Sequence, residues 1–367
     1  MNSPFETVRV ELGDRSYDIE LGVALWNRLA QALTERFHPK RAIVVTDSNV
    51  GPLYEPKLVE AFRASGVELS FHRMNAGEEH KNLSTVQMLY DQILSRGCDR
   101  KTPLIAMGGG VPGDTGGFVA ATLLRGIPFI QVPTSLLAMV DSSVGGKTGV
   151  DTSHGKNLIG AFYQPALVSI SIDTLETLPS REVSAGLAEV IKYGVIWDSD
   201  LFAELETHID RLLEGERDAL IGIVKRCCQI KAEVVSKDEK ENDLRAILNF
   251  GHTVGHAIEA ATEYGEYLHG EAIAVGMVVE TEIARCLGRE LGDLLDREKE
   301  LFTRAKLPTV PPAHVEPQRI WELMHSDKKT LGGEIRMVLP SALGKVDLVP
   351  GITREVFERA WANSAGT

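Results

Sequence analysis

The chain has 367 residues, of which 43% are hydrophobic and 25% charged, and its formal net charge is −13. Because this length is about twice that of an ordinary domain, we expect two domains with a sizeable core. Such an acidic chain lacks the basic surface that non-specific nucleic-acid binding requires, and its uncharged runs, residues 126–140 and 157–172, are too short to span a bilayer.

The N-terminal half alternates short β-branched segments with helical patterns. Residues 8–21 predict a β-hairpin around Gly13 and Asp14. Further strands are expected at residues 42–46, 67–73, 103–107 and 128–132, and helices at residues 24–37, 57–64 and 84–96. Alternating strands and helices predict a mostly parallel sheet with helices on its faces.

After residue 179 the pattern becomes almost wholly helical. Helices are expected at residues 181–196, 199–214, 219–236, 243–262, 271–287, 294–305 and 353–363, and a short hairpin at residues 335–339 and 345–349. The sequence therefore predicts a Rossmann-like, mostly parallel α/β domain over residues 1–179 and a mainly α-helical domain over residues 180–367. We expect ligands in the cleft between the two domains.

The strand expected at residues 103–107 is followed by a glycine-rich turn, Gly108-Gly109-Gly110-Val111-Pro112-Gly113-Asp114. Such a turn between a strand and a helix lets backbone N–H groups approach a pyrophosphate at the positive helix end. The spacing differs from the usual dinucleotide-binding fingerprint, and tight backbone packing is the alternative reason for these glycines. Asp47, just after the strand at residues 42–46, can hold a ribose hydroxyl or cap a helix.

A second glycine-rich segment, residues 141–149, resembles a P-loop but has Asp141 in place of the first glycine. Lys147 and Lys156 bring two ammonium groups into glycine-rich loops, which predicts an anion site. A loop lysine is more often simply solvated. Glu189 and Lys192 have the i,i+3 spacing of a helical ion pair, which is also most often solvated.

Three of the ten histidines, His252, His256 and His269, fall within 18 residues. Positions four apart share a helix face, so His252 and His256 point the same way, and His269 can meet them if two helices pack as a hairpin. Imidazoles that converge from neighbouring helices indicate a divalent transition metal, most simply zinc. The spacing alone is equally compatible with hydrogen-bonded core histidines.

The cysteine pattern bears on the compartment. The four cysteines, Cys98, Cys227, Cys228 and Cys286, form no C-x-x-C pair. This usage is typical of free thiols in a reducing compartment. We therefore expect a soluble, cytoplasmic protein without a membrane or nucleic-acid partner.

Taken together, these segments resemble the 3-dehydroquinate synthase family of sugar phosphate cyclases over roughly residues 77–339. The matching motifs occur in order at residues 77–81, 108–114, 133–138, 141–149, 155–157, 162–165, 186–194, 249–256 and 327–329. The resemblance implies an NAD-dependent enzyme with zinc or cobalt, usually a homodimer. Pro112 departs from the family pattern, in which an aliphatic residue is commoner, and removes one N–H from the phosphate turn.

The resemblance also implies the reaction. The expected enzyme is a phosphorus–oxygen lyase of the shikimate pathway, which leads to chorismate and the aromatic amino acids. It converts a sugar acid phosphate, 3-deoxy-D-arabino-heptulosonate 7-phosphate, into 3-dehydroquinate and phosphate. The steps are transient oxidation of C5 by NAD, β-elimination of phosphate, reduction of C5, ring opening and an intramolecular aldol closure.

The resemblance assigns site residues by position. The expected metal ligands are Glu189, His252 and His269. Catalytic and proton-transfer roles are expected for His256, Glu241, Lys147 and Asn157. Substrate contacts are expected at Arg125, which would reach a neighbouring subunit's site, and at Asp141, Lys192, Lys231, Arg245, Asn249 and Lys328, although its neighbour Lys329 is an alternative. NAD contacts are expected at Asp47, Ser48, Asn49, Gly77, Glu78, Glu79, His80, Lys81, Gly110, Val111, Pro112, Gly113, Asp114, Thr134, Ser135, Lys156, Thr174, Leu175, Glu176 and Thr177.

Two other functions compete with this assignment. Related cyclases act on sedoheptulose 7-phosphate or glucose 6-phosphate, which lack the C1 carboxylate. The cationic set of Arg245, Lys231 and Lys328 therefore favours the heptulosonate substrate. Polyol dehydrogenases that share the glycine-rich fold perform a net oxidation. They do not need so many lysines, and Glu189 as a metal ligand suits them less well.

Overall fold

The computed structural model of the chain describes residues 5–241, 243–263, 265–327 and 334–366. The chain forms two compact units: Met1–Leu178 with Leu220–Ser236, and Pro179–Ala219 with Lys237–Thr367. Helix α7 (Arg217–Lys237), expected within the helical part, therefore contributes most of its length to the first unit. As a boundary between functional domains, the division at residue 179 stays a prediction.

The first unit is built on a seven-stranded sheet in the order β1-β2-β9-β6-β5-β3-β4. The strands are β1 (Phe5–Val10), β2 (Tyr17–Gly22), β3 (Arg41–Asp47), β4 (Glu68–Met74), β5 (Leu104–Gly108), β6 (Phe129–Pro133) and β9 (Leu167–Ser171). Strands β1 and β2 form the expected antiparallel hairpin, and the other neighbours pair in parallel. Strand β9 was not predicted, although it is as fully buried as the predicted strands β5 and β6.

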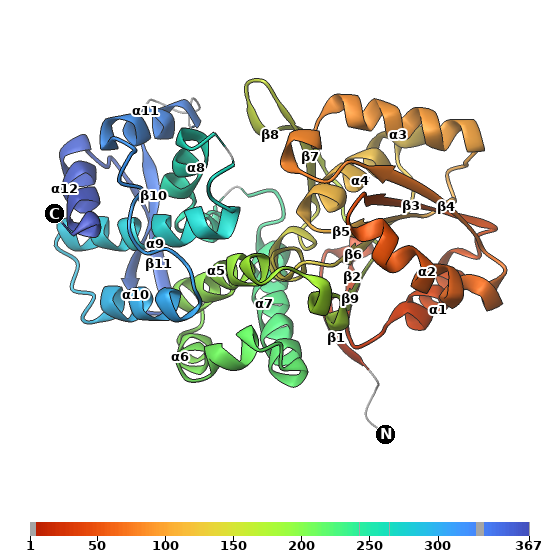
Figure 1. Cartoon of the computed structure of the whole chain (residues 1–367), viewed down its shortest axis with the longest axis horizontal. Helices are drawn as coiled ribbons and strands as arrows, with labels where there is room; N and C mark the ends of the chain where they lie inside the picture. Colours follow the sequence, from red (N-terminus) through yellow and green to blue (C-terminus); the bar gives the residue numbers. More distant parts are fainter. Residues whose placement is uncertain (1–4, 242, 264, 328–333, 367) are drawn as a thin grey trace. The chain divides into compact units, whose positions relative to one another are not determined.

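Helices cover both faces of this sheet (Figure 1). On one face α1 (Trp26–Phe37) and α2 (Val50–Phe62) share a core with Val44 of β3. On the other face α3 (Leu83–Arg96) and α4 (Gly110–Thr122) pack around Ile43 and Val45 of the same strand. Successive side chains of a strand point to opposite faces, so one apolar strand supplies both cores. The predicted α/β layers are confirmed.

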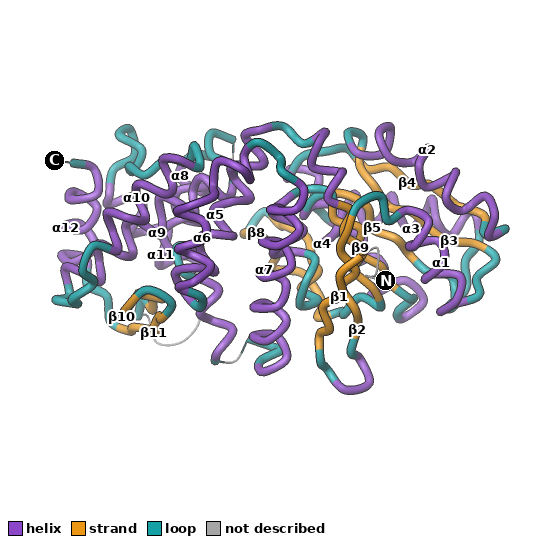
Figure 2. The backbone as a smooth tube through the Cα atoms, turned by 90° about the horizontal axis from the view of Figure 1, so that it is seen from below, coloured by secondary structure: helices purple, strands orange, loops and turns teal. Residues whose placement is uncertain are grey.

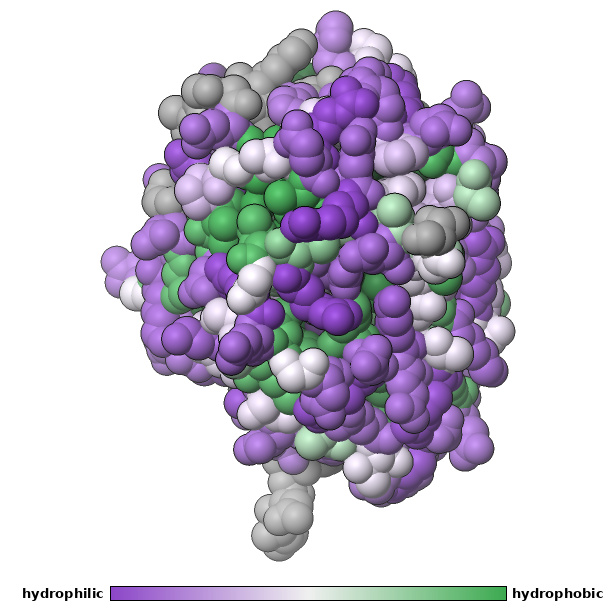
Figure 3. Space-filling model, turned by 90° about the vertical axis from the view of Figure 1, so that its left-hand side faces the viewer, coloured by the Kyte–Doolittle hydropathy of each residue, from purple (hydrophilic) through white to green (hydrophobic). Residues whose placement is uncertain are grey.

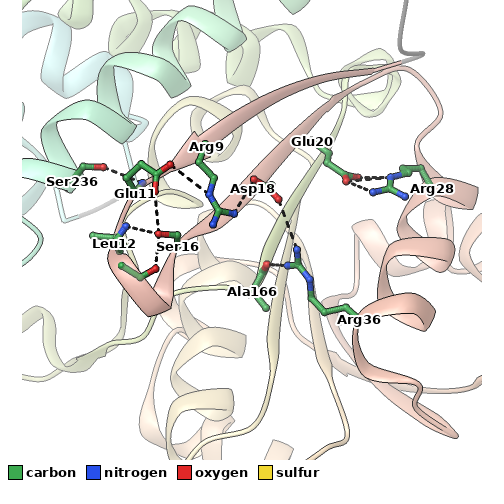
Figure 4. Close-up of polar contacts among 11 residues, drawn as sticks. Arg9, Glu11, Leu12, Ser16, Asp18, Glu20, Arg28, Arg36, Ala166 and Ser236 are labelled. Carbon is green, nitrogen blue, oxygen red and sulfur yellow. Dashed lines mark hydrogen bonds and ion pairs between the residues drawn. The ribbon is translucent and has the colours of Figure 1, made fainter.

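Polar contacts attach the β1–β2 hairpin to the rest of the first unit (Figure 4). Arg9 donates to Asp18 across the hairpin at 3.0 Å. The N–H of Glu11 donates to the hydroxyl of Ser236, near the end of α7, at 3.2 Å. Lys225 of α7 also pairs with a carboxylate of β1 at 2.7 Å. These contacts explain why α7 belongs to the first unit.

The glycine-rich region after residue 141 differs from the expected loops. Residues beyond a π-helical turn (Ala138–Ser142) form an antiparallel hairpin of β7 (Lys147–Thr152) and β8 (Gly155–Phe162). Gly149 faces Gly160 across this hairpin, and a Cβ on either would overlap the backbone of the other strand. The loop prediction for Lys147 and Lys156 was therefore wrong, because these glycines allow two strands to approach closely.

The second unit is mainly helical and contains one two-stranded hairpin (Figure 2). Its elements are α5 (Ser180–Ile196), α6 (Ser199–Leu213), α8 (His252–Ala261), α9 (His269–Cys286), α10 (Leu294–Arg304), α11 (Pro317–Asp327), β10 (Arg336–Ala342), β11 (Lys345–Pro350) and α12 (Arg354–Ala365). Helix α9 is buried on all sides from Ala272 to Ala284, so it forms the centre of this unit. Helix α11 was not predicted.

The helix expected at residues 243–262 is interrupted. A 3-10 helix, η7 (Leu244–Asn249), precedes Gly251, whose φ of 80° lies in the left-handed region. A continuous helix cannot pass through that conformation, so α8 begins only at His252. The buried carboxylate of Glu280 on α9 accepts the N–H groups of Gly251 at 2.8 Å and Val254 at 3.2 Å. This cap holds the new helix start against α9.

The surface of the second unit includes three exposed large hydrophobic side chains, Leu287, Val310 and Leu348. On the face drawn in Figure 3, hydrophobic residues gather in the middle of a hydrophilic surround. Among the described residues, none of the helices combines the length and the apolar character that crossing a bilayer demands.

Candidate active site

Glycines bring three helices of the second unit into backbone contact. A Cβ on Gly270, next to His269, would overlap the carbonyl group of Ala185 on α5. A Cβ on Gly276 of α9 would likewise overlap the carbonyl group of Gly251 at the start of α8. Helices that approach this closely place their side chains within direct reach of one another, and α5, α8 and α9 each carry a predicted metal ligand.

The three predicted ligands converge. The Nε2 atoms of His252 and His269 lie 3.5 and 3.6 Å from Oε1 of Glu189, and one donor atom from each residue lies within 4.8 Å of the others. Glu189 is fully buried. The ring centroids of His252 and His256 are 5.3 Å apart, so the predicted shared helix face is confirmed.

This donor set fits a divalent metal ion. Ligands about 2.0–2.2 Å from a tetrahedral ion lie roughly 3.3–3.6 Å apart, close to the two distances from Glu189. The Nδ1–H of His252 donates to the carbonyl oxygen of Phe250 at 3.0 Å, and that of His269 to Glu259 at 3.3 Å. Both Nε2 lone pairs can then face the same point, and three protein ligands leave a position open, as catalytic zinc sites do.

The same surroundings separate the basicities of the two imidazoles. Burial lowers the pKa of His252 well below its usual value, and the ammonium of Lys192 lowers it further. Burial also lowers the pKa of His269, but hydrogen bonds to Glu189 and Glu259 outweigh it and raise that pKa to about 10. The two carboxylates thus favour the protonated form of His269, and the ammonium of Lys192 also contacts Glu189.

Other predicted residues of the second unit lie near these elements. Lys192 is almost fully buried, and its ammonium contacts the carboxylate of Glu189. The side chain of Asn249 donates to Glu241 at 2.9 Å. Arg245 is 1% exposed and donates to the carbonyl oxygen of Glu239 at 2.6 Å. A buried guanidinium and a buried ammonium are costly unless acceptors meet them, and here the carbonyl oxygen of Glu239 and the carboxylate of Glu189 do so.

The residues predicted to bind a nucleotide lie at the carboxyl end of the first unit's sheet. Strand β3 has β4 on one side and β5 on the other, so the chain reverses its direction of winding there, and such switch points bind ligands in open α/β sheets. Asp47 ends β3, and the glycine turn follows β5, with α4 starting at Gly110. The ring of Pro112 occupies the space that a Cβ on Gly108 would need. Pro112 stands in the first turn of α4, where an N–H has no helical partner.

The structure brings several predicted NAD contacts together. Asp47 accepts the N–H groups of Asn49 and Val50 at 2.8 Å, so it caps α2. Ser48 accepts the N–H of Ala76, the residue before Gly77, at 3.1 Å. The N–H of Thr134 donates to the carbonyl oxygen at the end of β5 at 2.9 Å. Thr174 and Thr177 lie on the 3-10 helix Ile172–Thr177, and the Tyr54 hydroxyl of α2 donates to the Thr174 carbonyl at 3.1 Å.

A cluster of charges adjoins the glycine turn. The ammonium of Lys81 lies 2.6 Å from Asp114 and 4.0 Å from Glu78, and Lys156 lies 3.8 Å from Glu78. Lys81 is 4% exposed. The predicted residues of segments 77–81, 110–114 and 155–157 thus form one network, which holds the glycine turn beside β8.

Two further predicted substrate contacts lie near this network: Lys231 acts electrostatically on Asp114, and Asn157 follows Lys156 in β8. Lys231 of α7 donates to Asp141 at 2.7 Å and is almost fully buried. Arg125 is exposed, with a φ of 68°, and no described contact joins it to another predicted site residue. Asn157 has a φ of 55°, and its N–H donates to Asp151 at 2.7 Å. Lys328 and Lys329 lie outside the described residues.

Two carboxylates near the histidines were missed by the sequence reasoning. Glu259 contacts His269, and Glu280 caps α8. Glu259 follows His256 by three positions and His252 by seven, which places it on the same helix face. That spacing was a usable signal. Nothing local marks Glu280, because its partners belong to another helix.

Comparisons with known proteins identify the family of the chain. Two family models match: 3-dehydroquinate synthase N-terminal over residues 71–185, and 3-dehydroquinate synthase C-terminal over residues 186–330. A 3-dehydroquinate synthase of Desulforamulus reducens is 48% identical over 93% of this chain and 95% of its own length.

Two solved structures share the fold. A 2-deoxy-scyllo-inosose synthase complexed with carbaglucose-6-phosphate, NAD+ and Co2+ has a TM-score of 0.88 and 30% identity, covering 96% of this chain and 100% of its own. A 2-epi-5-epi-valiolone synthase from Streptomyces hygroscopicus subsp. jinggangensis, with NAD+ and Zn2+ bound, has a TM-score of 0.88 and 29% identity, covering 97% and 98%. With both family models matched in order and a relative nearly half identical over almost its whole length, the chain belongs to the 3-dehydroquinate synthase family.

Proposed function

We propose that this chain converts 3-deoxy-D-arabino-heptulosonate 7-phosphate into 3-dehydroquinate and phosphate, as an NAD- and metal-dependent phosphorus–oxygen lyase. The observation that carries the proposal is the convergence of Glu189, His252 and His269, with 3.5 and 3.6 Å between donor atoms, in a chain of this family. The two solved cyclases with this fold contain NAD+ and Co2+ or Zn2+.

The metal ligands in this proposal are Glu189, His252 and His269. A bound zinc or cobalt ion would lower the pKa of a substrate hydroxyl and favour its oxidation. The chain's own part is to hold both Nε2 atoms toward one carboxylate oxygen, through the hydrogen bonds at Nδ1. Two imidazoles and one carboxylate suit either metal.

NAD binding in this proposal belongs to the first unit, at the ends of β3, β5 and β6 and along the 3-10 helix η6 (Ile172–Thr177). The chemistry supplied by bound NAD would be a reversible hydride transfer at C5 of the substrate. The glycine turn would present backbone N–H groups to the pyrophosphate at the start of α4. The Lys81–Asp114 pair holds that turn in place.

Substrate anions would be bound by the buried cations. Lys192 and Arg245 are 1% exposed, and Lys231 is 4% exposed, so a phosphate or carboxylate that meets them forms strong charge-assisted hydrogen bonds. Lys147, Asn157, Asn249, Asp141, Arg125 and Lys328 are the further substrate contacts that we propose. The demand for several cations follows from a substrate that carries both a phosphate and a carboxylate.

Proton transfer is assigned to His256 and Glu241. His256 lies beside the two histidine ligands, with centroid distances of 5.3 and 5.9 Å. Its place beside the ligand set and the acid–base chemistry of an imidazole support this role. Glu241 orients Asn249 through the hydrogen bond at 2.9 Å. We also propose a homodimer located in the cytoplasm.

The test is a complete reaction with the heptulosonate phosphate, zinc and NAD in catalytic amount. We expect many phosphates released per NAD, 3-dehydroquinate as the organic product, and no lasting rise in NADH absorbance. His252→Ala should lose metal binding and turnover together, whereas His256→Ala should keep the metal and lose most of its rate. Stoichiometric NADH would instead favour a polyol dehydrogenase. Turnover restricted to glucose 6-phosphate or sedoheptulose 7-phosphate would favour another cyclase.

A further inference from the structure

The imidazole of His269 lies between two carboxylates. Its Nε2 faces Glu189 at 3.6 Å, and its Nδ1 faces Oε2 of Glu259 at 3.3 Å. Glu259 belongs to α8 and is 3% exposed. A buried carboxylate is costly to desolvate, so the contacts of Glu259 must offset that cost.

The second imidazole of the cluster is held differently. His252 donates its Nδ1–H to a neutral backbone carbonyl, that of Phe250, at 3.0 Å. A carboxylate accepts a hydrogen bond more strongly than a carbonyl, and an acceptor behind a ligating imidazole makes it a more basic ligand. Glu259 should therefore make His269 a more basic ligand than a carbonyl acceptor would.

We propose that Glu259 is a positioning residue for the metal site: by accepting the Nδ1–H of His269, it selects the tautomer whose Nε2 binds metal and fixes the ring toward Glu189. This inference rests on the proposed metal-dependent function. It assigns Glu259 no contact with the metal or substrate.

Another arrangement of the same residues is a second metal ion. One donor atom each from His256, Glu259 and His269 also lie within 4.8 Å of one another. In that arrangement the Nδ1 of His269 would have to lose its proton and bind the second ion, so Glu259 would be a ligand. The two arrangements differ in metal stoichiometry, one ion per chain against two.

The experiment compares Glu259→Ala and Glu259→Gln with Glu282→Gln. Glu282 is another buried carboxylate of the second unit, bonded to Asn363 at 2.7 Å, and it lies about 20 Å along α9 from His269. Co2+ affinity is measured by competition with a chelator, and stoichiometry by metal analysis. We expect one ion per chain, Co2+ binding weakened by roughly 10- to 100-fold in Glu259→Ala, a smaller loss in Glu259→Gln, whose amide oxygen still accepts the N–H, and no change in Glu282→Gln.

Proton NMR of the Co2+-loaded protein gives a readout that general destabilisation does not move. Each ligating imidazole contributes one shifted, exchangeable N–H signal, so the natural chain should show two. Glu259→Ala should lose the His269 signal to solvent exchange and keep the His252 signal. Glu259→Gln should restore the His269 signal.

Each other outcome has a definite meaning. If the natural chain binds no Co2+ or Zn2+, the proposed metal site and this inference both fail. If the natural chain binds one ion, and Glu259→Ala binds Co2+ equally tightly and keeps both N–H signals, the metal site stands and only the positioning role of Glu259 is wrong. Two ions in the natural chain and one in Glu259→Ala would replace it with the second-metal arrangement.

Discussion

Replacing Gly276 by alanine should separate the helices that carry the proposed metal ligands. A Cβ at this position of α9 would lie 2.0 Å from the carbonyl oxygen of Gly251, whereas real Cβ atoms keep at least about 3.0 Å. The obstacle is backbone, which cannot rotate away as a side chain would. Helix α8 must therefore move by about 1 Å, and it begins at His252.

A movement of this size exceeds what a metal site tolerates, since ligand distances hold within about 0.2 Å. Overpacking of a buried contact costs roughly 1–3 kcal/mol as well. We expect Gly276→Ala to bind zinc at least tenfold more weakly, and to unfold at a lower temperature than the natural chain. Zinc affinity is measured by chelator competition and unfolding by calorimetry.

Gly222→Ala is the matched control. Gly222 lies within α7, and a Cβ there would meet nothing within 4 Å. The control should stabilise the helix by about 0.5–1 kcal/mol and leave zinc affinity unchanged. If Gly276→Ala keeps the natural affinity and unfolding temperature, then close contact between α8 and α9 does not set the ligand geometry, and the reasoning is refuted.

Three further predictions concern buried charges. Burial raises the pKa of Glu298 from 4.5 to about 8. Its contribution to stability is therefore complete below pH 4.5 and is lost as the pH rises through about 8. The unfolding temperature of Glu298→Gln should increasingly exceed that of the natural chain over this pH range, while the exposed control Glu300→Gln should show no such trend. Glu280→Ala removes the acceptor of two buried N–H groups at the start of α8. It should lower the free energy of unfolding by about 2–3 kcal/mol, which calorimetry would detect as a lower unfolding temperature. An unchanged unfolding temperature would mean that water replaces the carboxylate as acceptor. Arg245→Gln should raise the dissociation constant of the heptulosonate phosphate roughly tenfold or more with NAD affinity nearly unchanged in calorimetric titration, and equal losses for both ligands would indicate a folding defect.

The sequence by itself determined the features that depend on neighbours along the chain. The alternation of strands and helices predicted the α/β layers, and the hairpin around Gly13 formed as expected. The spacing of His252 and His256 predicted a shared helix face, which the ring distance of 5.3 Å confirms. Periodicity encodes these features because it requires only regular local geometry.

Only the tertiary structure decided which distant residues meet. The break at Gly251, the β7–β8 hairpin and the cap from Glu280 depend on contacts between segments far apart in sequence. The pairing of Glu259 with His269 depends on how α8 packs against α9. A short segment has no local preference strong enough to specify such partners, because their energy arises from burial and hydrogen bonds that exist only after the helices and strands have packed.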